Sequence, residues 1–128
     1  MKSKGSRTER ELLHKFFEAG WGAIRTAGSG STTELATDLI AGKDGKVLAI
    51  ECKSGKAYKK RYITNEQIDE LRKFSKKFGA EPWIGMRFDN EDWKFLKIEQ
   101  LDKLGNSYGV NLKLAKQKGI SFKELTER

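Results

Sequence analysis

The chain has 128 residues, 37% apolar and 34% charged, a composition typical of one folded, water-soluble domain rather than of a disordered chain. Its 26 Lys and Arg against 18 Asp and Glu give a formal net charge of +8, which favours a polyanionic partner such as nucleic acid. The lone cysteine, Cys52, excludes an intramolecular disulfide and a cysteine-based zinc cluster. The first residues lack an apolar leader and no apolar run is long enough to span a membrane, so we expect a single cytoplasmic domain over residues 1–128.

The N-terminal part of the sequence predicts a helix and then a strand. Apolar side chains recur at helical spacing up to Gly20, and Ser6 with Glu9 three residues later has the pattern of a capping box. We therefore expect a helix over residues 7–19. Residues 21–26 alternate in the manner of a strand.

Two apolar runs around Asp44-Gly45 predict a β-hairpin, because Asp-Gly favours the tight two-residue turn that joins such strands. Counting outward from this turn places Asp38 opposite Glu51. Opposed residues project from one face with Cβ atoms about 4.5–5.5 Å apart. Side chains alternate along a strand, so Lys53 shares the face of Glu51.

A second helix and two further strands follow. Thr64 and Gln67 form another capping-box pattern, and an apolar stripe then extends to Phe78, where Gly79 can end the helix in the left-handed conformation. Two apolar runs around a polar turn predict strands over residues 83–88 and 93–98. The predicted order is αβββαββ, an α/β fold with a central mixed five-stranded sheet flanked by helices.

The periodicity is weaker towards the C-terminus. We expect a short helical turn over residues 99–104, an extended piece over residues 108–114, and a last helix capped by Ser121 with Glu124.

The acidic pair on the hairpin suggests a metal site. Two facing carboxylates repel each other unless a cation neutralises them, and carboxylate oxygens suit Mg²⁺ or Mn²⁺ better than zinc. Such an ion would activate water and polarise a phosphodiester, with the ammonium group of Lys53 stabilising the developing charge. The alternative is an ordinary surface ion pair between strands, but the apolar hairpin and the basic net charge favour the metal site. Cys52, on the opposite face from Glu51, is expected to be a small core residue.

These residues resemble a known family. Asp38 followed by Glu51-Cys52-Lys53 is similar to the PD-(D/E)xK nuclease motif, although Thr37 stands where the motif has Pro. Glu9-Arg10-Glu11-Leu12 and the stretch from Arg25 to Ser31 are similar to segments of the archaeal Holliday junction resolvases.

The resemblance covers nearly all of residues 5–98 and implies a restriction-endonuclease-like core. It further implies a homodimer that cleaves four-way DNA junctions with Mg²⁺, or with Mn²⁺ as an alternative. The acidic metal-site and catalytic residues would be Glu9, Asp38 and Glu51, and Lys53 would be the catalytic lysine. Ser29 falls where the resolvases have a serine that matters for cleavage.

Glu9 has two interpretations. It lies on the helical face of Leu13 and Phe16, so it could point into the protein and complete the metal site. As the third residue after Ser6, it could instead cap the helix. The residues alone leave these alternatives open, and the resemblance favours the metal site.

Basic and aromatic side chains supply the remaining candidates. The resemblance implies that Arg10 and Arg25 contact DNA near the site, where a guanidinium suits a phosphate; without it they would be ordinary surface or ion-pairing residues. The basic segment with Lys56, Lys59, Lys60 and Arg61 would ordinarily be a solvated loop, and we expect it to contact DNA phosphates at most. Phe74 and Phe78 add more apolar surface than one face of the second helix needs for the core, and the related resolvases dimerise through this helix. We therefore assign them to a dimer interface.

The sequence thus predicts a structure-specific endonuclease for branched DNA. Two alternatives stay open. One is another nuclease of the same superfamily, of restriction or repair type; the other is a branched-DNA-binding module without catalytic activity.

Overall fold

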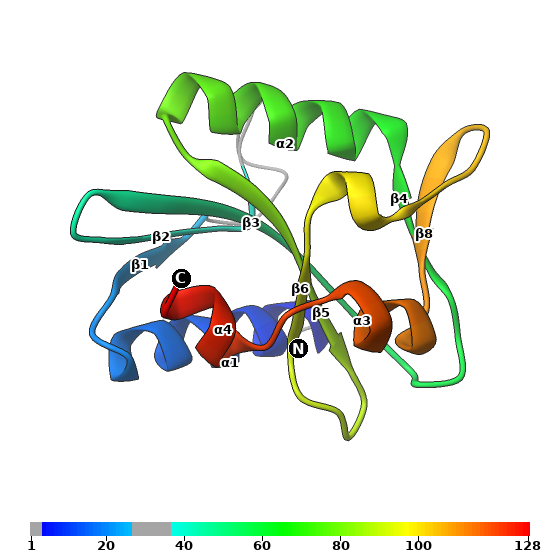
Figure 1. Cartoon of the computed structure of the whole chain (residues 1–128), viewed down its shortest axis with the longest axis horizontal. Coiled ribbons are helices and arrows are strands. Elements are labelled where there is room, and N and C mark those ends of the chain that lie inside the picture. Colours follow the sequence, from blue (N-terminus) through cyan, green and yellow to red (C-terminus); the bar gives the residue numbers. More distant parts are fainter. Residues whose placement is uncertain (1–3, 27–36) are drawn as a thin grey trace.

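A computed structural model describes residues 4–26 and 37–128, and its centre is a five-stranded mixed sheet (Figure 1). The strand order is β1-β2-β3-β5-β6, in which β3 and β5 are parallel and the other neighbours antiparallel. The strands are β1 (Gly22–Arg25), β2 (Leu39–Lys43), β3 (Lys46–Gly55), β5 (Glu81–Phe88) and β6 (Lys94–Leu96). The predicted five-stranded mixed sheet is confirmed.

Helices cover both faces of this sheet, with α1 (Lys4–Glu18) on one side and α2 (Asn65–Phe78) on the other (Figure 1). The α1 side buries Leu12 and Phe16 against Leu48 and Ile50. On the other side, Ile68 and Leu71 of α2 pack against the strand residues whose side chains point the opposite way. These strand residues are Ile40, Ala49, Ile84 and Met86. Because β3 is buried on both faces, its centre is a continuous apolar run, as expected for a central strand with a parallel neighbour.

Both predicted helices exist, but only one of the two N-terminal caps is correct. Helix α2 has the predicted box, in which Thr64 and Gln67 bond reciprocally, and Gly79 ends the helix at φ 80°. The predicted box of Ser6 and Glu9 is wrong, because α1 begins at Lys4 and already includes both residues.

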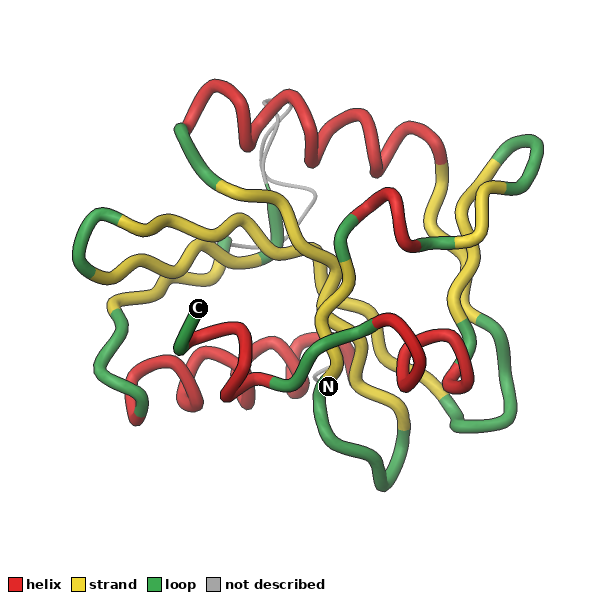
Figure 2. The backbone as a smooth tube through the Cα atoms, in the orientation of Figure 1, coloured by secondary structure: helices red, strands yellow, loops and turns green. Residues whose placement is uncertain are grey.

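A second, three-stranded sheet in the order β4-β8-β7 stands beside the first and was not predicted (Figure 2). Its strands are β4 (Arg61–Thr64), β7 (Asp102–Lys103) and β8 (Ser107–Val110). Each strand has four residues or fewer, which is too short for a clear periodicity, and β4 pairs with β8, more than 40 residues further along the chain.

The C-terminal predictions are partly correct. The helical turn is a 3₁₀ segment, η1 (Ile98–Gln100), and the expected extended piece ends at Val110, after which Asn111 caps α3 (Leu112–Lys118). The last helix, α4 (Phe122–Thr126), has the predicted Ser121–Glu124 box. Among the described residues no helix is both long and apolar enough to cross a membrane.

Candidate active site

The β2–β3 hairpin brings Asp38 and Glu51 together. Asp44 (φ 51°) and Gly45 (φ 84°) form the tight turn, and pairing beyond it runs in regular register up to Leu39 opposite Ile50. Two consecutive left-handed residues are the signature of the turn type that matches the twist of a hairpin. Asp38 and Glu51 occupy the next opposed positions, so the predicted pairing is confirmed.

Backbone and side-chain hydrogen bonds hold this end of the hairpin in place. The amide of Cys52 donates to Oδ2 of Asp38 at 2.9 Å, which orients the carboxylate across the strand pair. Thr37, only 2% exposed, donates its hydroxyl to the carbonyl of Ile50 at 2.8 Å. Thr26 donates its backbone amide to the carbonyl of Asp38 at 3.1 Å. The residue that replaces the motif's Pro thus fastens the start of β2 to β3.

Burial and mutual repulsion raise the pKa values of the two carboxyl groups. Burial raises the pKa of Asp38, although the bond from Cys52 and the charge of Lys53 oppose this shift. Burial and the neighbouring Asp38 raise the pKa of Glu51 to about 8. The two carboxyl groups therefore share a proton near neutral pH. A bound cation would offset the repulsion between the two carboxylates and so favour their ionised forms.

Glu9 lies near this pair, but its carboxylate is directed elsewhere. It accepts from Nη2 of Arg25 at 3.1 Å and from Nε at 3.2 Å. Burial, and to a smaller extent the charge of Asp38, raise the pKa of Glu9, and Glu9 in turn contributes to the raised pKa of Glu51. The three carboxyl groups are therefore electrostatically coupled. Glu9 comes from α1, on the opposite face of the sheet from Glu51, and within residues 4–26 and 37–128 no three acidic, His or Cys side chains form a ready-made metal cluster. The assignment of Glu9 as a ligand remains a prediction.

Lys53 and Cys52 point to opposite sides of β3, as the alternation predicted. Lys53 is partly buried, and its charge partly opposes the rise in pKa that burial causes at both Asp38 and Glu51. Cys52 belongs to the core on the α1 side, where burial raises the pKa of its thiol well above the usual range. The thiol is therefore an inert core group.

The candidate DNA-contact residues differ in how freely they can reach a ligand. Lys56 and Lys59 are exposed, whereas Arg10 is partly buried. Lys60 pairs with Asp102 at 3.2 Å, and the stem of Arg61 packs against Gly55. Arg25 is held by Glu9, and Ser29 lies outside the described residues.

The two phenylalanines of α2 stack on each other with ring centroids 5.3 Å apart. Phe74 packs against the core, while Phe78 is 53% exposed. One face of this aromatic pair is thus open to solvent.

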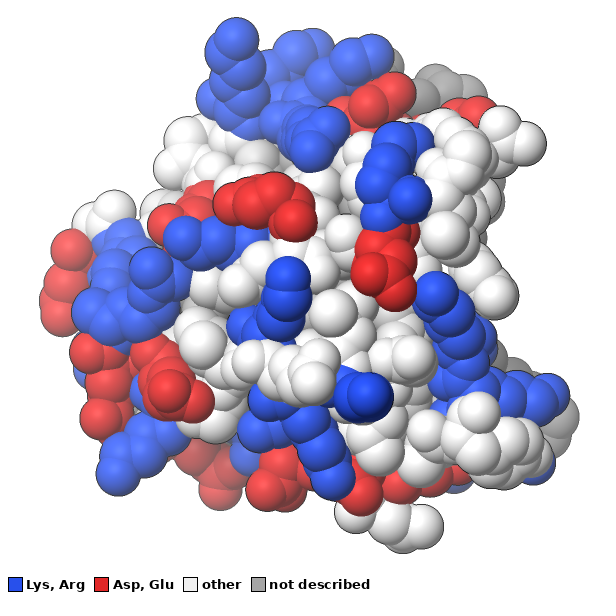
Figure 3. Space-filling view, turned by 45° about the vertical axis from the view of Figure 1, so that its right-hand side comes forward, with Lys and Arg blue, Asp and Glu red and all other residues white. Residues whose placement is uncertain are grey.

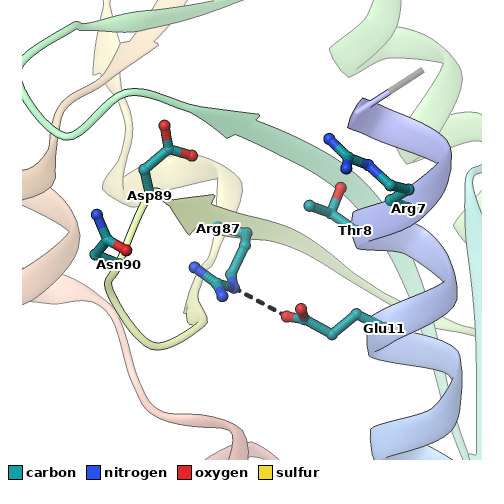
Figure 4. A pocket seen from close by; sticks show the side chains of 6 residues that line it. All are labelled: Arg7, Thr8, Glu11, Arg87, Asp89 and Asn90. Atoms are coloured by element: carbon teal, nitrogen blue, oxygen red, sulfur yellow. Dashed lines mark hydrogen bonds and ion pairs between the residues drawn. The ribbon is translucent and has the colours of Figure 1, made fainter.

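A polar clamp between α1 and β5 was not predicted from the sequence. Oε1 of Glu11 accepts from Nε of Arg87 at 2.9 Å and from Nε1 of Trp93 at 2.6 Å, which ties α1 to β5 and to the residue before β6. Figure 4 shows Glu11 and Arg87 with Arg7, Thr8, Asp89 and Asn90 around a hollow of about 450 Å³. Glu11 lies within the resolvase-like stretch, but nothing in the sequence pairs it with Arg87.

Known proteins resemble the whole chain. Residues 1–128 match the family described as archaeal Holliday junction resolvase (Hjc). The crossover junction endodeoxyribonuclease Hjc of Archaeoglobus fulgidus is 34% identical over 131 residues, covering 97% of this chain and 96% of that protein. The Methanocaldococcus jannaschii protein of the same name is 37% identical over 125 residues, covering 98% of this chain and 88% of that protein.

Solved structures agree with the sequence relatives. The crystal structure of Archaeoglobus fulgidus Hjc superposes with a TM-score of 0.86 at 27% identity and covers 95% of this chain and 99% of that one. A bacterial homing endonuclease shares the fold, with a TM-score of 0.55 at 14% identity. The fold is therefore restriction-endonuclease-like, and the chain belongs to the archaeal Holliday junction resolvase (Hjc) family.

Proposed function

We propose that this chain, as a single nuclease domain, resolves four-way DNA junctions by hydrolysing one phosphodiester bond in each of two opposed strands. The observation that carries the proposal is the facing pair of Asp38 and Glu51 with Lys53 on the same side of the hairpin. The choice of substrate is supported by the names of the family and of its crossover-junction endonuclease relatives.

The donor set fits a hard divalent cation. Two buried carboxyl groups with raised pKa values, on a strand pair fixed by hydrogen bonds, would be stabilised by a positive ion between them. Oxygen ligands favour Mg²⁺, or Mn²⁺ as an alternative, held by Asp38 and Glu51. An ion held there would supply Lewis-acid chemistry, which lowers the pKa of water and stabilises negative charge at the scissile phosphate.

The chain's own residues then orient the reaction. The amide of Cys52 keeps the Asp38 carboxylate in place, and the ammonium group of Lys53 stabilises the negative charge that develops on the phosphate. Arg25 is the residue that can exchange a carboxylate for a DNA phosphate, because its guanidinium suits either. Such an exchange would free Glu9 as a third ligand.

Basic side chains on the surface would bind the DNA backbone. Figure 3 shows Lys and Arg gathered over the top of the molecule, where α2 lies, and in smaller groups with acids between them on the rest of that face. Without a base-reading element among the described residues, these contacts position the DNA and do not specify its sequence. Affinity should fall steeply as salt rises.

Two active sites require two subunits, and we propose that the exposed side of the aromatic pair on α2 forms part of a homodimer interface. Phe78 is 53% exposed, and Ile24, on the edge strand β1, is 61% exposed. Apolar groups of this size on the surface favour contact with a second copy.

The test is a cleavage assay with Mg²⁺, a four-way junction and a linear duplex of the same sequence. We expect paired nicks in the junction and little cutting of the duplex. Lys53→Ala should abolish nicking and leave junction affinity near that of the wild type, with Lys43→Ala, an exposed lysine on β2, as the matched control.

Each alternative gives a different result. Equal cutting of junction and duplex would indicate a nuclease of restriction or repair type. Tight junction binding by the wild type without nicking in Mg²⁺ or Mn²⁺ would indicate a binding module.

A further inference from the structure

The segment that follows the catalytic strand is unusual in composition. From Cys52 to Asn65 there is no acidic residue, while Lys and Arg occur five times. Tyr58 and Tyr62 stand among these cations and are 77% and 56% exposed. Tyrosine usually buries most of its ring, so two solvent-exposed rings in one basic segment indicate a binding surface.

The loop that carries Tyr58 is braced at both ends. At its start, the carbonyl of Gly55 accepts from the amide of Asp89 at 2.9 Å, and Lys59 closes a turn onto Lys56 at 3.0 Å. At its end, Lys60 pairs with Asp102 at 3.2 Å. In Figure 1 this connection between β3 and β4 projects at the far end of β3 from the β2–β3 hairpin. The ring of Tyr58 is thus presented on a fixed loop.

The surroundings leave both rings uncovered. The one ring contact of Tyr58 among the described residues is the ammonium group of Lys56, 6.0 Å from the ring centroid. Tyr62 pairs across the small sheet with Gly109, which has no side chain to lie over the ring. The stem of Lys60 fills the space above Gly109. Each tyrosine therefore offers an aromatic surface next to cations.

The loop lies within reach of DNA bound at the catalytic site. Tyr58 lies five positions after Lys53, and a fully extended chain over five positions spans at most about 17 Å. This is roughly five steps along a DNA strand at about 3.4 Å each. One DNA molecule can contact both.

Branched DNA exposes base faces that a linear duplex does not. In a duplex each base is stacked on its neighbours, so an aromatic side chain finds no free base face, whereas stacking is interrupted at a branch point. Aromatic side chains bind exposed base faces without sequence preference, and cations nearby bind the flanking phosphates.

We propose that Tyr58 stacks on an unstacked base at the branch point and thereby makes the protein prefer branched DNA over linear duplex, with Tyr62 as a second exposed ring in the same basic segment. Lys56 and Lys59 bind phosphates of either DNA and add affinity without preference. This inference rests on the proposed junction-resolving function.

The test compares dissociation constants for a four-way junction and a linear duplex, without divalent metal so that the DNA stays intact. The variants are Tyr58→Ala, Tyr58→Phe and Lys59→Ala, and a 2-aminopurine base at the branch point reports stacking by its fluorescence. Tyr58→Ala should weaken junction binding roughly tenfold and leave duplex binding unchanged, with the fluorescence change lost. Tyr58→Phe should retain preference and fluorescence change, and Lys59→Ala should weaken both complexes equally.

The outcomes separate this inference from the proposed function. If the wild type nicks junctions selectively and Tyr58→Ala keeps both the preference and the fluorescence change, the stacking role is wrong and the proposed function stands. A Tyr58→Ala variant that loses affinity equally for both DNAs also overturns the stacking role. A wild type without preference for junctions overturns both.

Discussion

Removing the charge of Glu51 should stabilise the metal-free protein at high pH. In the folded chain the pKa of Glu51 is about 8, against an ordinary value of 4.5, so the folded state holds a proton that the unfolded state has lost between these two pH values. Folding stability therefore falls as pH rises through this window. A shift of this size in the pKa of one group corresponds to roughly 4–5 kcal/mol of folding stability. Because Asp38 and Glu51 share the proton, we expect the free energy of unfolding to fall by only about 1–3 kcal/mol across this pH window.

Glu51→Gln keeps the shape and the neutral form of the side chain. We expect its urea midpoint in EDTA to equal that of the wild type near pH 5 and to exceed it near pH 8.5. Glu70→Gln, at an exposed position on α2, is the control and should follow the wild type. Added Mg²⁺ should raise the midpoint of the wild type most at high pH and that of Glu51→Gln far less. Parallel pH profiles for wild type and Glu51→Gln in EDTA would refute the reasoning.

Three further predictions follow from single contacts. Thr37→Val should cost about 1–2 kcal/mol of unfolding free energy in urea, because the buried carbonyl of Ile50 loses its hydroxyl donor; an unchanged midpoint would contradict this. Phe78→Glu should shift sedimentation from dimer to monomer while circular dichroism stays native, and a variant that remains dimeric would exclude Phe78 from the interface. For Glu11, burial opposes ionisation, but the bonds from Arg87 and the indole lower its pKa, so its stabilisation is present above pH 4.5 and lost below it. Glu11→Gln should remove this loss of folding stability at low pH, which amounts to about 1 kcal/mol or less at so exposed a site. If the free energy of unfolding of Glu11→Gln falls below pH 4.5 as much as that of the wild type, this prediction is wrong.

The features that could be predicted from the sequence depend on local signals. Asp44-Gly45 specifies its turn type by backbone preference alone, and the register of Asp38 and Glu51 then follows by counting. Thr64 and Gly79 bound α2 in the same way, because caps act within a few residues. These predictions were correct since no distant contact competes with the local preference.

The features that were missed depend on distant contacts. The pattern of Ser6 and Glu9 is a genuine capping signal, yet Glu9 bonds instead with Arg25, which lies on another element. The clamp of Glu11 and Arg87 joins residues 76 positions apart. Nothing in a single sequence shows which of many charged residues will meet across the sheet.

A hairpin with a two-residue turn also limits which insertions and deletions the chain can accept. One extra residue between Asp44 and Gly45 would shift the pairing of β2 by one position, and side chains alternate with a period of two. Asp38 would then turn away from Glu51 into the side that packs on α1. Length change at this solvent-exposed turn, ordinarily the most tolerant part of a protein, would therefore dismantle the acidic pair at the other end of the strands.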